Sequence, residues 1–94
     1  MYARIAEFQS TSKTNCDMII AFFQNVMIPR NIKNGQLSAE IYRVSDTTGF
    51  VISCFKNKND ANKIMKIMAV ELNEVKGNTR IKLVEGERAL RLDA

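Results

Sequence analysis

The chain has 94 residues, 46% of them hydrophobic and 26% charged, which is the composition of a globular protein and predicts one domain over residues 1–94. Its net charge of +4 is only weak evidence for an anionic partner, because its Lys and Arg residues are spread along the chain and form no dense cluster. The chain contains no histidine, and its two cysteines lie far apart and in no CxxC pattern, which argues against zinc, haem and a histidine general base.

The N-terminal third predicts a strand followed by a helix. Met1–Phe8 carries apolar side chains on both faces of a two-residue alternation, so we expect a strand that is covered on both sides. Thr14 followed by Asp17 resembles a capping box, and the helix that follows should run to about Ile28 and stop near Pro29. Its apolar arc is much wider than the ~100° that one sheet contact needs. The helix should therefore contact the sheet and a second surface, which is either a partner chain or a pocket.

A β-hairpin is predicted in the middle of the chain. Leu37–Val44 and Phe50–Phe55 are rich in β-branched and aromatic residues, and they flank the polar segment Ser45–Gly49. A polar segment of this length that ends in Gly is typical of a hairpin loop. Gly35 allows the turn into the first of these strands. The second strand is apolar on both faces, which suits a central position in a sheet.

The C-terminal third predicts a second helix and a last strand. The helix should cover about Asp60–Lys76, with Asn59 or Asp60 as its cap and Gly77 as the residue that ends it. Thr79–Glu85 has the alternation of a strand. Residues 87–94 form either an extra strand that reaches a second subunit or a frayed end, and the sequence favours neither.

This order of elements predicts an α+β, ferredoxin-like βαββαβ fold. Right-handed crossovers give an antiparallel sheet in the order 4-1-3-2 with both helices on one face. The opposite face is partly apolar on the two central strands. Covering it with the same face of a second molecule is the simplest solution, so a homodimer through the sheet face is expected.

Two features bear on the compartment. The apolar run Met18–Phe23 is too short to span a membrane, and neither a signal peptide nor a transmembrane helix is predicted. We expect Cys16 and Cys54 to act as small buried hydrophobic residues in a reduced compartment. A single disulfide between them is the alternative. We expect a cytoplasmic protein without a membrane partner.

The length, the order of elements, the Gly before the hairpin and the segment Cys54–Ala61 resemble the antibiotic biosynthesis monooxygenase-like domains over roughly residues 1–86. These belong to the dimeric α/β-barrel superfamily. The resemblance implies that two ferredoxin-like sheets pair into a barrel, which would bury the open sheet face. It also implies a cofactor-independent monooxygenase that binds a small aromatic or quinol-type molecule between sheet and helices. The family further includes haem-degrading enzymes and many small proteins without known activity.

Few of the family's site residues have a counterpart in this sequence. Phe55 corresponds to a position that is Trp in many active members, and Phe8 falls where haem-degrading members have Asn. Their haem-ligating His has no counterpart, so no cofactor is expected. A cofactor-free oxygenase needs an apolar pocket with a few orienting polar groups. The candidates for the pocket lining are Met18, Phe22, Tyr42, Phe55, Met65 and Met68, with Arg4, Arg43 or Tyr42 as polar handles.

Other interpretations remain open at this point. Each apolar candidate could equally be an ordinary core or interface residue, and Arg4 and Arg43 could form salt bridges with Glu7, Glu40 or a partner subunit. A non-catalytic ligand-binding or regulatory dimer is the main alternative to an enzyme. An RNA-binding module is disfavoured, because Phe50 and Phe55 point to opposite faces of the strand and cannot form one stacking platform.

Overall fold

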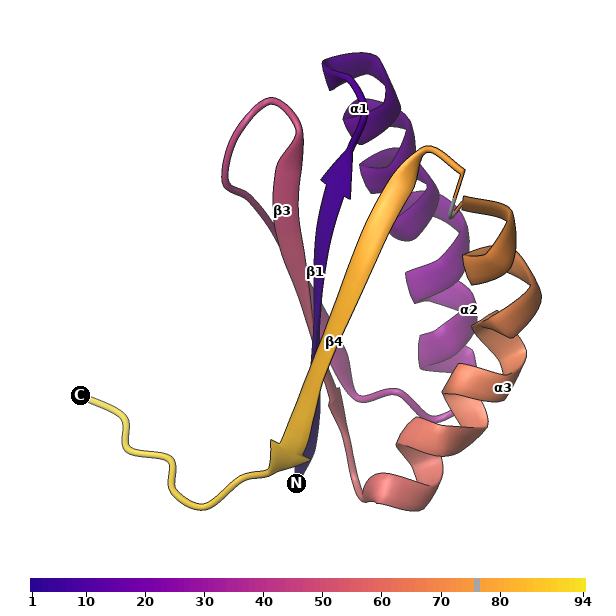
Figure 1. Ribbon diagram of the computed structural model, residues 1–94. Helices are drawn as coiled ribbons and strands as arrows, with labels where there is room; N and C mark the ends of the chain where they lie inside the picture. Colours follow the sequence, from indigo (N-terminus) through magenta and orange to yellow (C-terminus); the bar gives the residue numbers. More distant parts are fainter. Residues whose placement is uncertain (76) are drawn as a thin grey trace.

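The computed structural model describes residues 1–75 and 77–94. The chain runs from a strand through a helical segment, a hairpin and a second helix to a last strand (Figure 1). Their bounds are β1 Tyr2–Ser10, α1 Lys13–Phe22, η1 Phe23–Met27, α2 Ile28–Lys33, β2 Ser38–Arg43, β3 Thr48–Phe55, α3 Lys58–Val75 and β4 Thr79–Glu87. The strands form one antiparallel sheet in the order β2-β3-β1-β4, which is the predicted order read from the other edge. The helices cover one face of this sheet, and the ferredoxin-like fold is confirmed.

The first helical segment extends further than the sequence predicted. The helical run does not stop near Pro29. Helix α1 passes into η1, a turn of π-helix in which the Ile28 N–H donates to the Phe23 carbonyl, and α2 continues the run to Lys33. Pro29 then falls in the first turn of α2, directly after the π-helical turn. The N-cap also differs, since Ser12, not Thr14, accepts a hydrogen bond from the backbone of Asn15.

Two glycines serve different needs around the hairpin. Gly35 has a φ of +111°, which favours glycine, and it turns the chain from α2 into β2 as predicted. Gly49 was expected in the loop but lies inside β3, opposite Phe8 of β1. A Cβ at Gly49 would lie 2.6 Å from the Phe8 ring and would also collide with the Tyr42 carbonyl oxygen. Gly49 is therefore required for close packing within the sheet.

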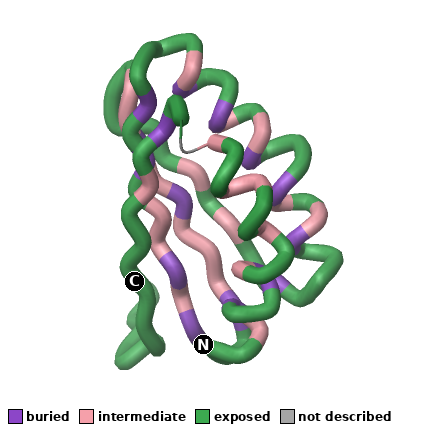
Figure 2. The backbone as a smooth tube through the Cα atoms, turned by 45° about the vertical axis from the view of Figure 1, so that its right-hand side comes forward, coloured by how far each residue is buried: buried purple, intermediate pink, exposed green. Residues whose placement is uncertain are grey.

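The core lies between the sheet and the helices, where the buried positions of both layers face each other (Figure 2). One cluster is built around Phe8, Val51 and the helical segment 16–27, and the other joins Tyr2 and Phe55 to the start of α3. Phe55 and Ile64 are among the largest side chains that are fully buried. The second cluster thus fixes α3 over the ends of the two central strands.

The C-terminal part follows the prediction closely. Helix α3 begins after Asn57, whose side-chain oxygen accepts a hydrogen bond from the Asp60 N–H, so the cap lies two to three residues earlier than expected. The expected helix end at Lys76 lies outside the described residues. Residues 88–94 form no strand with this chain, and they leave on the side of the sheet that the helices do not cover (Figure 1). No helix in the described ranges is long and apolar enough to cross a membrane.

Candidate functional site

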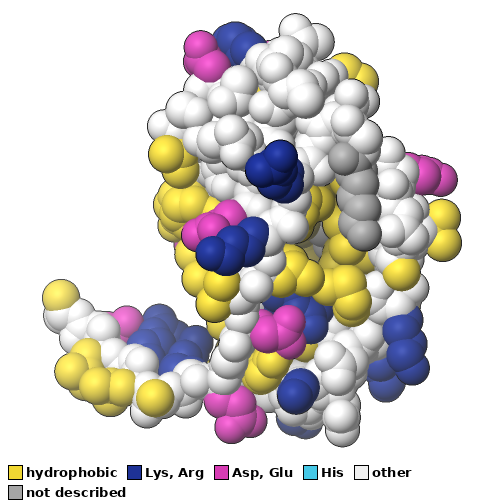
Figure 3. All heavy atoms as spheres, in the orientation of Figure 1, with side chains coloured by type: hydrophobic (Ala, Val, Ile, Leu, Met, Phe, Trp, Pro, Cys, Tyr) yellow, Lys and Arg dark blue, Asp and Glu magenta, His cyan; other side chains and the backbone are white. Residues whose placement is uncertain are grey.

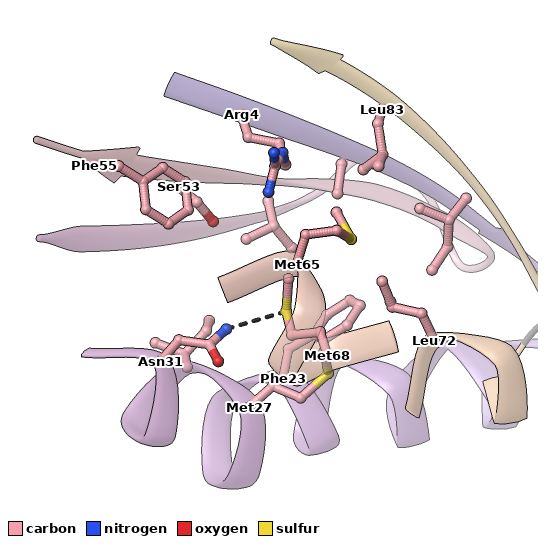
Figure 4. A pocket seen from close by; sticks show the side chains of 14 residues that line it. Arg4, Phe23, Met27, Asn31, Ser53, Phe55, Met65, Met68, Leu72 and Leu83 are labelled. Carbon is pink, nitrogen blue, oxygen red and sulfur yellow. Dashed lines mark hydrogen bonds between the residues drawn. The ribbon is translucent and has the colours of Figure 1, made fainter. Parts of the chain in front are cut away.

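An apolar cavity of about 50 Å³ lies between the helix-facing side of the sheet and the helices. Side chains of both the sheet and the helices form its walls (Figure 4). The lining residues are Arg4, Ala6, Phe23, Met27, Ile28, Asn31, Val51, Ser53, Phe55, Met65, Met68, Leu72, Ile81 and Leu83. Three of them are methionines, whose unbranched side chains change shape readily. The cavity therefore has walls that can yield to a ligand.

An ion pair whose two charges balance lies at the sheet side of the cavity. Arg4 is 5% exposed and lies directly opposite Glu85 in the β1–β4 register. Its Nε is 2.9 Å and its Nη2 is 3.1 Å from the Glu85 carboxylate, and its Nη1 donates to the Ala61 carbonyl at 2.9 Å. The guanidinium lies 5.7 Å from the centre of the Phe55 ring, as in a cation–π contact. Because Glu85 balances its charge, Arg4 gives the cavity no net attraction for an anion.

The helix side of the cavity presents a polar residue that the sequence analysis missed. Asn31 of α2 is 3% exposed, and its Nδ2 donates to the Met68 sulfur at 3.1 Å. Its Oδ1 has no hydrogen-bond partner. Figure 4 shows Asn31 on the helix side and Arg4 and Ser53 on the sheet side, with Met65 and Met68 between them. The cavity thus combines an apolar interior with a few polar groups at its two sides.

The position of α2 relative to α3 is fixed by a second ion pair. Arg30 lies next to Asn31 and pairs with Glu71 through both of its terminal nitrogens, with an Nη2 to Oε2 distance of 2.8 Å. The hydrogen bond from Arg30 lowers the pKa of the Glu71 carboxyl below its usual range. This pair joins the two helices that carry Asn31 and Met68.

The structure brings four of the candidate residues together and separates the others. Arg4, Phe55, Met65 and Met68 line the same cavity. Met18 and Phe22 line a different groove, between α1 and the end of α3. Tyr42 stacks on Phe50 on the open sheet face, with the ring centres 5.0 Å apart. Arg43 donates a hydrogen bond to Asp17 at 2.6 Å and further hydrogen bonds to carbonyl groups of the hairpin loop.

A surface groove adjoins the cavity between α3 and β4. It has a volume of about 330 Å³ and shares four lining residues with the cavity, namely Met65, Leu72, Ile81 and Leu83. Hydrophobic side chains gather in the gap between β4 and α3 (Figure 3). The shared side chains lie between the cavity and the groove, so this gap is the candidate entrance to the cavity.

Within residues 1–75 and 77–94, no group of three or more His, Cys, Asp or Glu side chains is arranged to hold a metal ion. Cys16 is buried in α1, Cys54 lies on β3, and both are free thiols. The ionisable groups at the cavity are Arg4, which lines it, and Glu85, which forms an ion pair with Arg4.

The Arg4–Glu85 pair predicts a loss of stability in acid. The hydrogen bonds from Arg4 and then Tyr2 lower the pKa of Glu85 below its ordinary 4.5. The stabilisation is therefore present above the unfolded pKa and is lost as the pH falls through the folded pKa. In urea titrations, we expect Glu85→Gln to lower the free energy of unfolding at neutral pH, and we expect this difference to shrink as the pH falls below 4.5. Glu74→Gln, at an exposed position of α3, controls for the loss of one carboxylate, and an equal cost of Glu85→Gln at every pH would contradict the pairing.

Solved structures with the same arrangement come from several bacteria and from marine samples. SnoaB, a cofactor-independent oxygenase from Streptomyces nogalater, superposes with a TM-score of 0.78 over 99% of this chain and 97% of its own, at 7% identity. A dimeric ferredoxin-like protein from an uncultured marine organism gives 0.81 over 97% of both chains, also at 7% identity. A protein of Nitrosomonas europaea provisionally named an antibiotic biosynthesis monooxygenase gives 0.74 over 96% of this chain and all of its own, at 15% identity.

The chain has the ferredoxin-like fold of the antibiotic biosynthesis monooxygenases. The resemblance predicted from the sequence is confirmed at the level of the fold. No protein-family model and no curated protein sequence matches the chain. Identities of 7–15% show the shared fold alone, so the chemistry of this chain has to be argued from its own cavity.

Proposed function

We propose that this protein binds a small, neutral aromatic molecule of the phenol or quinol class between its sheet and its helices. The apolar cavity with polar groups at both sides carries this proposal, because such a pocket is typical of small-molecule sites. Since the charge of Arg4 is balanced by Glu85, a neutral molecule fits better than an anion. An aromatic ring suits walls made of Phe55 and methionine sulfur.

The ligand has to enlarge the cavity as it enters. A volume of about 50 Å³ holds one or two water molecules, whereas an engineered cavity of ~150 Å³ is known to hold benzene. Rotation of Met65 would join the cavity to the groove of about 330 Å³ between α3 and β4, because both are lined by this side chain. The proposed binding site is the combined space.

We further propose that the protein works as a homodimer joined through the open sheet face. Register places Ile5 beside Ile52 and beside Val84 on that face, and the stacked rings of Tyr42 and Phe50 lie in the next row. Similar structures are described as dimeric ferredoxin-like proteins. Residues 88–94 leave on the same side and carry the exposed Leu90 and Leu92, so we expect them to contact the second copy. The two free thiols favour a reducing compartment such as the cytoplasm.

Cofactor-independent oxygenation is the second candidate function, and the similarity to SnoaB favours it. In this reaction a ring CH₂ group loses a proton, its carbon forms a bond to O₂, and the peroxide then breaks to give a carbonyl and water. The proton needs a base. The Glu85 carboxylate already accepts hydrogen bonds from Arg4 and Tyr2, which lowers its basicity. The cavity therefore supports binding better than it supports this reaction.

Oxygen uptake with anthrone distinguishes the two functions. We expect anthrone, whose enol tautomer is a phenol, to bind saturably and to consume O₂ no faster than it does in buffer, because the cavity offers no unengaged base. Leu83→Trp fills the entrance and should abolish binding, whereas Val70→Trp on the exposed side of α3 should not. Accelerated uptake that Leu83→Trp removes would establish an oxygenase instead. Absence of saturable binding would contradict both functions.

A further inference from the structure

Asn31 is held in place by the end of its own helix. Its backbone carbonyl accepts hydrogen bonds from the Asn34 N–H and from the Gln36 N–H, both at 3.0 Å. Gln36 is itself buried and donates through its side chain to the Ser38 carbonyl. The π-helical turn of η1 sets the rotation of α2, and Asn31 follows Phe23 and Met27 on one helix face at four-residue steps. The backbone of Asn31 is thus held in place by the end of α2.

The carboxamide of Asn31 makes only part of the hydrogen bonds that it can form. Its Nδ2 donates to the Met68 sulfur, which is a weak acceptor, and its Oδ1 has no partner although the residue is 97% buried. A buried polar atom without a partner destabilises a folded protein, and native structures contain few of them. This oxygen has almost no accessible surface in the present cavity. Asn31 nevertheless lines the cavity, and a ligand that displaces the Met68 side chain as it enters would bring its own polar group to the carboxamide.

We propose that Asn31 Oδ1 accepts a hydrogen bond from a hydroxyl group of the aromatic ligand and thereby selects phenols over hydrocarbons and aryl ethers. This inference rests on the proposed function, since it assigns the specificity of the same site. A carbonyl oxygen accepts but cannot donate, so only a ligand with an O–H or N–H group satisfies it. A methyl ether of the same ring would leave the oxygen unpaired and would also have to accommodate the extra methyl group.

Binding of three matched probes tests this assignment. For the unmodified protein we expect 1-naphthol to bind about tenfold more tightly than 1-methoxynaphthalene and naphthalene, as one additional hydrogen bond predicts. Asn31→Leu should weaken the binding of 1-naphthol to the level of the other two and leave theirs unchanged or tighter. Leucine has a similar size, favours helix and removes a buried unpaired atom, so this variant should fold. Asn25→Leu, at an exposed position of η1, is the control and should keep the preference.

The outcomes separate this inference from the proposed function. If all three probes bind with equal affinity, or if Asn31→Leu keeps the preference for 1-naphthol, the assignment of Asn31 is wrong while the aromatic site stands. If none of the probes binds, both are wrong. A preference that disappears in Asn31→Leu and persists in Asn25→Leu supports the assignment.

Discussion

Phe55→Ala is expected to lower the free energy of unfolding by about 3–5 kcal/mol, as is typical for the truncation of a buried aromatic ring. Phe55 is 1% exposed and contacts the guanidinium of Arg4, so both apolar burial and the cation–π contact are lost. We also expect weaker binding of 1-naphthol, because the ring forms one wall of the cavity, while the dimer should persist because Phe55 lies on the face turned to the helices. Urea denaturation and fluorescence titration measure the two effects.

Phe55→Leu separates the two roles of the ring. Leucine keeps most of the apolar volume, so the loss of stability should stay below about 1.5 kcal/mol. Affinity for 1-naphthol should still fall, because the aromatic surface is removed. If Phe55→Ala lowers only the stability and leaves the affinity unchanged, Phe55 is a core residue and the ligand does not contact it.

Ile52→Glu is expected to convert the proposed dimer to a monomer. Ile52 lies on a central strand of the open sheet face, next to Ile5 of β1 and Glu40 of β2. In a twofold interface the same patch occurs on both copies, so one substitution introduces two carboxylates close to the existing Glu40 side chains. Burying these charges without partners costs several kcal/mol. Light scattering at several protein concentrations measures the change in mass.

Val70→Glu is the matched control for this prediction. Val70 is 68% exposed on α3, so a charge there should leave both the dimer and the fold intact. Ile52→Glu that stays dimeric would show that the subunits meet elsewhere. An unmodified protein that is monomeric at all concentrations would contradict the dimer itself.

The fold could be predicted from the sequence because its elements carry strong local signals. The hairpin, the strand order and Gly35 followed from residue patterns, and the structure confirms them. The end of the first helix could not be predicted, because a proline after Ile28 normally ends a helix. The structure continues the helical run through Pro29 by way of the π-helical turn, and residue patterns do not signal such a turn.

The same turn explains why Asn31 was missed. With the helix expected to end near Pro29, Asn31 was expected to lie beyond it. Continuing the helix through the proline would have placed it four residues after Met27 on the same face. The two-residue alternation of the first strand, by contrast, predicts that Arg4 shares a face with Tyr2 and Phe8. The structure places all three on the helix-facing side of the sheet.

The methionine methyl groups provide the most direct test of binding between sheet and helices. The chain has five methionines, of which Met27, Met65 and Met68 line the cavity, while Met1 and Met18 lie outside it. With ¹³C-methyl methionine, titration with 1-naphthol should shift the signals of the three cavity residues and leave those of Met1 and Met18 in place. Shifts at Met18 alone would move the site to the groove between α1 and α3, and an unchanged spectrum at saturating 1-naphthol would contradict the proposed binding site.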